Sequence, residues 1–170
     1  MTKKNAKTNL KENEKKNNII KVIGDGYNWM GTFFSSPIIY QDNLFFCADQ
    51  MYKYLMCKDK DFRKNVLNSI SVKQLSFVTS YKNMQENKWK IRDDWKEVRT
   101  KKILMVQKYK FYYNPLLAKM LLDTDDSIIV FDVNDNFLGK KDENGENKVG
   151  KALMKVREKL KEGDLETYKL

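Results

Sequence analysis

A polar turn that leads into an amphipathic helix is the part of this sequence best suited to bind a small polar ligand. The turn covers residues 144–148, and apolar residues then recur at the helical positions 149, 153, 156 and 160. Gly145 and Asn147 tolerate a positive φ and can aim backbone N–H groups at a ligand. An acidic stretch, residues 132–135, lies shortly upstream. A strand, an acidic loop, a glycine turn and a helix in this order predict a nucleotide or sugar site.

The absence of histidine limits the chemistry that this chain can perform. It excludes Ser-His-Asp and Cys-His mechanisms and ordinary zinc sites with histidine ligands. Proton transfer must therefore come from carboxylates, lysine, tyrosine or water. Cys47 and Cys57 lie ten positions apart without metal-type spacing, which favours free buried thiols over a disulfide. We expect no metal site and no cofactor.

The composition is typical of one intracellular domain. The chain has 170 residues, of which 41% are hydrophobic, enough to build a single core. No apolar run approaches the roughly 18 residues of a membrane span. The first residues are polar and rich in lysine, unlike a secretory signal. We therefore expect a cytoplasmic location.

The net charge of +10 is concentrated at the N-terminus. Residues 1–21 hold seven lysines and two glutamates, which is half of the excess. Residues 1–18 lack hydrophobic periodicity and are predicted to be a disordered tail, followed by one domain over residues 19–170. Such a tail can help to hold a polyanion without reading its sequence, although a solubilising arm is the simpler interpretation.

The remaining pattern predicts a mostly helical α+β domain with a small β-sheet. Strands are expected over residues 19–23, 37–40, 44–46 and 127–133, with a hairpin turn at 41–43. Helices are expected over residues 48–57, 61–70, 72–81, 95–113, 116–122 and 149–161, and loops over 82–92 and 134–148. Ser71 and the pair Asp93-Asp94 are the expected N-caps of two of these helices.

Several short motifs occur in a characteristic order. They are Gly31-Thr32-Phe33 before Ser36-Pro37-Ile38, the stretch from Phe46 to Met56, Arg92-Asp93-Asp94-Trp95, Lys110-Phe111, Asn114-Pro115-Leu116, Leu121-Leu122-Asp123-Thr124, Asp135-Asn136-Phe137-Leu138-Gly139 and the stretch from Gly145 to Arg157. Through them the sequence resembles the NADAR family, the YbiA-like N-glycosidases, over residues 24–161. The resemblance implies a YbiA-like fold. The chain departs from the family pattern at four places, where Asp49 replaces a glutamate, Met56 a lysine, Leu138 a tryptophan and Gly31-Thr32 a Ser-Asn pair.

The resemblance also implies cleavage of an N-glycosidic bond between a ribose and a base. Family substrates include ribosylamino intermediates of the riboflavin pathway and ADP-ribose attached to guanine in nucleic acid. Breaking such a bond builds positive charge on ribose C1, which a carboxylate can stabilise, and the departing base needs a proton or hydrogen-bond donors. By resemblance, Asp49 and Asp135 are the candidate catalytic carboxylates.

The resemblance places further residues at the ligand. The candidates are Thr32, Phe33, Tyr52, Arg92, Trp95, Lys110, Gly139, Gly145 and Asn147. Trp95 would stack on a base, Lys110 would contact a phosphate, and Gly145 with Asn147 would form an anion-binding turn.

Structural interpretations of the same residues stay open at this point. Asp49 also suits an exposed helix face, and Asp135 suits a turn in which its side chain bonds its own backbone. Trp95 also suits the core, Lys110 a solvated surface, and the turn before residue 149 a plain helix entry.

Three functional hypotheses follow from these observations. The first is an N-glycosidase that acts on a ribosylated or ADP-ribosylated nucleotide or nucleic acid. The second is a catalytically degenerate protein that binds ADP-ribose-like ligands, and the third is a nucleic-acid-binding module that uses the basic tail. The expected partners are a nucleotide or ADP-ribose-type ligand, or nucleic acid that carries the modification, and no membrane. The sequence leaves the oligomeric state open.

Overall fold

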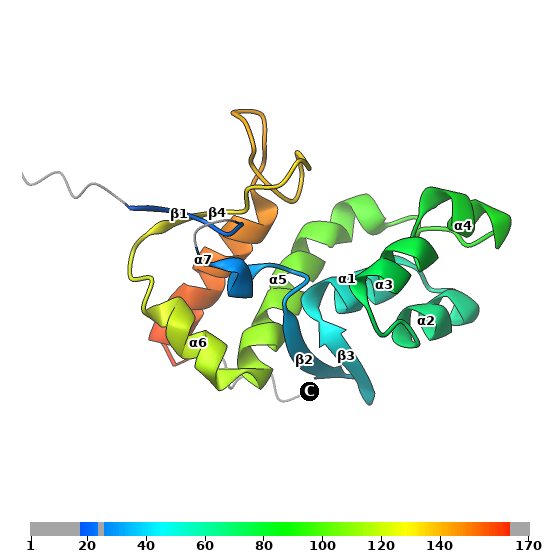
Figure 1. Ribbon diagram of the computed structural model, residues 1–170, viewed down its shortest axis with the longest axis horizontal. Helices are drawn as coiled ribbons and strands as arrows, with labels where there is room; N and C mark the ends of the chain where they lie inside the picture. The colour runs from blue at the N-terminus through cyan, green and yellow to red at the C-terminus, as the bar shows by residue number, and fades with distance from the viewer. Residues whose placement is uncertain (1–17, 24–25, 164–170) are drawn as a thin grey trace, which may run out of the picture.

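The fold was taken from a computed structural model, which describes residues 18–23 and 26–163 (Figure 1). Of the predicted tail, only Asn18 lies within this range. The described strands are β1 (Ile19–Lys21), β2 (Ser35–Tyr40), β3 (Asn43–Cys47) and β4 (Ile128–Val130). The helices are η1 (Asn28–Met30, a 3-10 helix), α1 (Ala48–Met56), α2 (Lys60–Leu67), α3 (Val72–Val78), α4 (Tyr81–Glu86), α5 (Trp95–Tyr113), α6 (Pro115–Leu122) and α7 (Lys148–Lys161). The prediction of a mostly helical α+β domain is confirmed.

The strands pair in two separate two-stranded sheets within the described residues, where we expected one small sheet. β2 and β3 form the predicted antiparallel hairpin, with Ile38 opposite Phe45. Gln41 and Asp42 at its turn both have positive φ, the conformation of a two-residue turn that matches the twist of the strands. β1 pairs in parallel with β4, far along the chain, so that Ile20 lies opposite Ile129.

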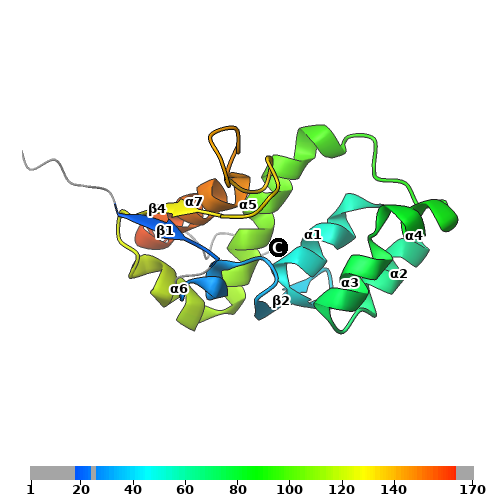
Figure 2. The same ribbon diagram turned by 45° about the horizontal axis from the view of Figure 1, so that its top comes forward.

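Helix α5 divides the core of the protein into two parts. Figures 1 and 2 show it running through the middle of the molecule, with α6 and α7 on one side and α1 to α4 on the other. One hydrophobic cluster joins α5 to β1, β4, α6 and α7, and the other joins it to the hairpin and α1 to α4. Ile103 belongs to the first cluster and Val106 to the second, so the two clusters meet near the middle of α5.

Two local predictions about the helices were wrong. The helix expected over residues 72–81 ends at Val78. A new helix, α4, begins at Tyr81 and continues into the expected loop, because Ser80 Oγ accepts the Asn83 N–H and caps it. Asp94 precedes α5 as expected, but its carboxylate accepts from the Arg92 guanidinium and makes no capping hydrogen bond. Ser71 does cap α3, as predicted, by accepting the Gln74 N–H.

Both cysteines are free and buried, as the sequence predicts. Burial raises the pKa of the Cys47 thiol to about 11, which keeps it protonated at neutral pH. Among the helices of the described residues, none is both long and apolar enough to cross a membrane.

Candidate functional site

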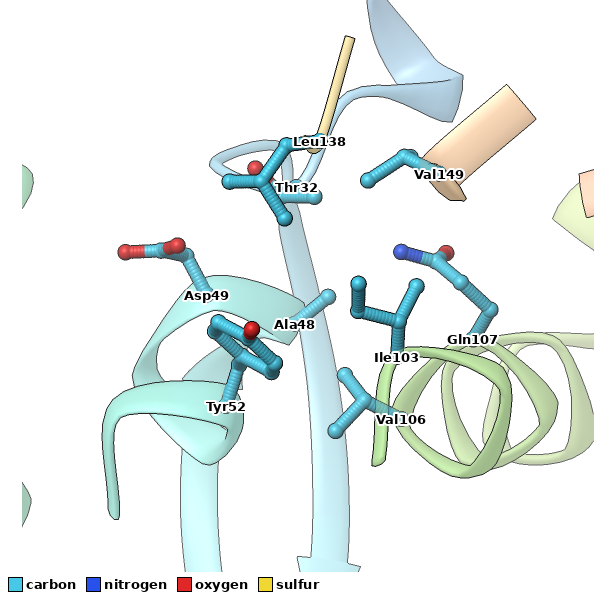
Figure 3. Close-up of a pocket in the computed structure, with 9 residues that line it drawn as sticks. All are labelled: Thr32, Ala48, Asp49, Tyr52, Ile103, Val106, Gln107, Leu138 and Val149. Carbon is cyan, nitrogen blue, oxygen red and sulfur yellow. The ribbon is translucent and has the colours of Figure 1, made fainter. Parts of the chain in front are cut away.

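A small pocket lies where the two hydrophobic clusters meet on α5 (Figure 3). Its apolar walls are Ala48, Ile103, Val106, Leu138 and Val149. Its polar walls are Thr32, Asp49, Tyr52 and Gln107. The cavity measures about 10 Å³, room for roughly one water molecule. A ribose therefore fits only if the walls move apart. One of these walls, Leu138, belongs to the long loop between β4 and α7.

Asp49 lies in the first turn of α1, and its side chain is only 6% exposed. Its backbone N–H donates to the Thr32 carbonyl at 2.9 Å, which joins α1 to the loop before β2. Burial raises the pKa of Asp49 from an ordinary 3.8 to about 6, and the charge of Lys53 opposes this rise. The exposed-face interpretation is therefore excluded, and a carboxyl with this pKa can exchange a proton near neutral pH.

Tyr52 lines the pocket one helical turn after Asp49. Burial raises the pKa of its hydroxyl well above the usual value, so the group stays protonated and can donate a hydrogen bond. The Arg99 guanidinium lowers the Tyr52 pKa, whereas the charges of Asp49 and Asp135 raise it further. The structure therefore brings both candidate carboxylates within electrostatic range of one phenol.

Asp135 lies on the exposed loop that carries Leu138. Its Oδ1 accepts from the backbone N–H groups of Phe137, at 2.9 Å, and of Leu138, at 2.8 Å. This is the turn that the structural interpretation predicted for this residue. The Asp135 carboxylate thus fixes the conformation of the loop segment that covers the pocket. The catalytic role of Asp135 stays a prediction.

Trp95, Arg92 and Phe33 lie outside the lining of the pocket. The Trp95 ring packs against Tyr52, with ring centroids 5.1 Å apart. Arg92 forms an ion pair with Asp94, and Phe33 is 49% exposed beside Thr32. Their contacts with a ligand stay predictions, and in this structure Trp95 supports Tyr52 from the start of α5.

Lys110 is fully buried, although the structural interpretation expected a solvated side chain. Its Nζ donates to the carbonyls of Trp29, at 2.7 Å, and Gly31, at 2.8 Å. Burial lowers the pKa of the amine from 10.5 to about 7. The residue fastens the segment that ends at Thr32, whereas its contact with a phosphate stays a prediction.

Asn147 joins the start of α7 to β4. It has a φ of 53°, the left-handed conformation that the sequence analysis anticipated. Its Oδ1 accepts the Phe131 N–H at 3.0 Å, and its Nδ2 donates to the Ile129 carbonyl at 2.9 Å. The side chain is buried and both its polar groups are used within the protein. A direct contact of Asn147 with a ligand stays a prediction.

The glycines of this loop are needed for close packing. Gly145 does not adopt the positive φ for which it was suited, but a Cβ there would lie 2.5 Å from Lys140 Cα. A Cβ on Gly139 would lie 2.5 Å from the Phe131 carbonyl oxygen. Both positions therefore exclude larger residues, because the loop folds closely upon itself.

The N–H groups before and at the start of α7 are bonded to the same loop. Those of Asn147, Lys148 and Val149 donate to the carbonyls of Gly139, Phe137 and Leu138 at 2.9 to 3.2 Å. They do not form the open anion-binding turn expected from the sequence, since loop carbonyls already occupy them. The result is a firm attachment of Leu138 above the pocket.

Replacing Asn147 with Ala should destabilise the fold by about 2–4 kcal/mol, because a buried N–H and a buried carbonyl lose their partners. Alanine is also less tolerant of the left-handed conformation than asparagine. Chemical denaturation would measure the free energy of unfolding, with the exposed Asn144→Ala in the same loop as the control. Equal stability of the two variants would contradict this role of Asn147.

Arg99 and Gln107 were missed by the sequence analysis. The Arg99 guanidinium carbon lies 3.5 Å from the centroid of the Phe137 ring, and Gln107 lines the pocket. Together with Trp95 and Ile103 they follow a spacing of four along α5 and so share one helix face. This spacing of four could have identified Arg99 and Gln107 in the sequence as residues on the same helix face as Trp95. Over the part of the chain that the structure describes, no group of three or more Cys, Asp or Glu side chains is placed to hold a metal ion.

Comparison with known proteins agrees with this architecture. The model of the NADAR domain matches residues 7–161. The chain belongs to the NADAR family. The fold is also similar to the NMR structure of the E. coli protein YbiA, with a TM-score of 0.74 and 21% identity over 88% of this chain and 89% of that one. No curated protein matched. The YbiA-like fold expected from the sequence is thereby confirmed, and the family match begins before residue 24.

Proposed function

We propose that this NADAR protein hydrolyses the bond between ribose and base in a ribosylated or ADP-ribosylated nucleotide or nucleic acid, such as ADP-ribosyl-guanine. The observation that carries this proposal is the buried Asp49 carboxyl, which has a pKa of about 6 and lies beside a protonated Tyr52. The family implies this reaction, and the pocket supplies groups that suit it without histidine.

The reaction requires charge stabilisation at ribose C1 and a proton for the departing base. As the C1–N bond breaks, its electron pair leaves with the base nitrogen, and the Asp49 carboxylate stabilises the cationic C1. A water oxygen then bonds to C1 and gives up a proton, while the base takes one. The near-neutral pKa of Asp49 allows it to accept the proton of water. The Tyr52 hydroxyl can hold the nucleophile or the sugar in place by a hydrogen bond.

A ligand-binding protein without catalysis is the second candidate function. Asp49 carries its carboxylate on a shorter side chain than the family glutamate, and misplacement of a reacting group lowers rates strongly. Met56 is buried at the end of α1 and lies outside the lining of the pocket, and Leu138 offers no flat ring for stacking. These three departures from the family pattern favour this alternative.

Incubation with substrates separates the two functions. The wild-type protein should release ADP-ribose and the unmodified base from ADP-ribosylated guanine DNA or from free ADP-ribosyl nucleosides, as detected by mass spectrometry. ADP-ribose binding in calorimetry without any release would favour the binding protein. Release by the double variant Asp49→Glu/Leu138→Trp, with no release by wild type, would also favour the binding protein. The two family residues would then have restored an activity that this protein has lost.

A further inference from the structure

Gln107 places an amide whose oxygen is unpaired at the wall of the pocket. Its side chain is 1% exposed, and its Oε1 is buried without a hydrogen-bond partner in the described structure. Figure 3 shows the amide reaching toward the cavity from α5, on the side opposite Asp49. A buried amide oxygen left unpaired opposes folding, so its presence in a well-packed core needs an explanation.

The other buried glutamine shows how this fold satisfies such a side chain. Gln50 Oε1 accepts the Phe46 N–H at 2.7 Å, and its Nε2 donates to the carbonyls of Val66, at 2.8 Å, and Ser69, at 3.0 Å. Gln50 therefore has a complete structural role between β3, α1 and α2. Gln107 is equally buried, yet its Oε1 has no hydrogen-bond partner within the described structure, and Figure 3 shows its amide nitrogen facing the cavity, which points to a partner that enters the pocket.

The surroundings of Gln107 indicate the chemistry of that partner. Ile103, Val106 and Val149 give this end of the pocket apolar walls, which suit the faces of a flat ring once the walls have moved apart to admit it. A glutamine amide offers one donor and one acceptor side by side, the arrangement that pairs with a nucleobase edge. The carboxylate of Asp49 lies on the opposite side, where the cationic sugar carbon is proposed to form.

We propose that Gln107 is the residue that selects the base, because its amide pairs with an adjacent donor and acceptor on the edge of the leaving base. This inference rests on the proposed function for the identity of the ligand. A base that lacks these groups leaves the amide unpaired in an apolar pocket. Sites built around such a hydrogen bond reject ligands that lack it far more strongly than purely apolar pockets do.

Binding of free bases to wild type and Gln107→Leu tests the proposal without requiring turnover. Calorimetry would compare guanine, hypoxanthine and adenine with unsubstituted purine, which lacks the exocyclic groups. Wild type should bind at least one substituted base about tenfold or more tightly than purine. Gln107→Leu should lose that preference while its melting temperature stays equal or rises, because leucine fills the site without an unpaired amide. The exposed Gln85→Leu serves as the matched control.

Each outcome separates the two proposals. A base preference that survives in Gln107→Leu, or no preference in wild type, overturns the role of Gln107 even if the protein cleaves ADP-ribosyl-guanine. A preference that disappears only in Gln107→Leu supports it. If that result is found while wild type cleaves none of the substrates, the selective role of Gln107 stands and the glycosidase proposal fails.

Discussion

Replacing Asp49 with Asn is expected to abolish hydrolysis and to make the protein more stable. The carboxylate that we propose to act at ribose C1 would be lost, and such a group typically contributes a rate factor of about 10² to 10⁴. Asparagine keeps the shape of the side chain but cannot ionise. The buried charge that the fold now tolerates would therefore disappear together with the activity, as expected for an active-site group held in an unfavourable environment.

The stability gain from Asp49→Asn should depend on pH with a definite sign. The pKa of Asp49 is raised from 3.8 to about 6 in the folded protein, so the folded state holds the proton more tightly than the unfolded chain. The wild-type protein therefore loses stability as the pH rises from 3.8 to about 6, by a total on the order of 3 kcal/mol. The Asp49→Asn variant does not lose stability in this way, because asparagine cannot ionise.

Unfolding by denaturant between pH 4.5 and 8 would measure this difference, with the exposed Asp93→Asn as the control. The advantage of Asp49→Asn over wild type should grow with pH up to about 6 and stay constant above it. A constant difference across the range would mean that Asp49 is not held in a desolvated site.

Replacing Lys110 with Met is expected to weaken the support of the pocket. The carbonyls of Trp29 and Gly31 would lose their common donor, at a cost of about 2–4 kcal/mol at pH 9. The segment that ends at Thr32 would also loosen, and Thr32 is the residue that holds the start of α1 at Asp49. We therefore expect both stability and hydrolysis to fall, with the larger effect on stability.

The pH dependence of this effect is opposite to that of Asp49. Because the pKa of Lys110 falls from 10.5 to about 7 on folding, the folded state binds the proton less tightly than the unfolded chain. Wild-type stability should therefore rise with pH between about 7 and 10.5, and Lys110→Met should lack this rise. Thermal unfolding at pH 7, 8 and 9 would show it, beside the exposed Lys101→Met as control. A parallel pH profile for Lys110→Met and wild type would contradict the buried position of this amine.

The elements that local sequence determines were predicted well. The hairpin follows from a turn of polar residues between two apolar strands, and α5 has the predicted bounds, Trp95–Tyr113. The parallel pairing of β1 with β4 was not predicted, because Ile20 and Ile129 come from distant parts of the chain and short strands do not specify a partner. The restart of the helix at Ser80 was missed because its capping role competed with a continuous helical pattern.

The sequence predicted some of the residues that lie together in the candidate site, but it did not predict the contacts that each of them makes. Thr32, Asp49 and Tyr52, three of the residues that the family motifs suggested, line one pocket, and their contact with a ligand stays a prediction. Lys110 and Asn147 instead use their polar atoms within the protein, which no local pattern reveals. Gly145 tolerates a positive φ but does not adopt one, and the structure needs a glycine there because the loop packs too closely for a Cβ.

The most direct test of the account compares release of ADP-ribose from ADP-ribosylated guanine DNA by wild type, Asp49→Asn and Asp93→Asn. The proteins would be used in excess over DNA, so that a single turnover is followed by mass spectrometry. We predict release by wild type and Asp93→Asn, and a rate at least about 100-fold lower for Asp49→Asn. Equal rates in all three proteins would contradict the claim that the pocket around Asp49 cleaves the bond between ribose and base.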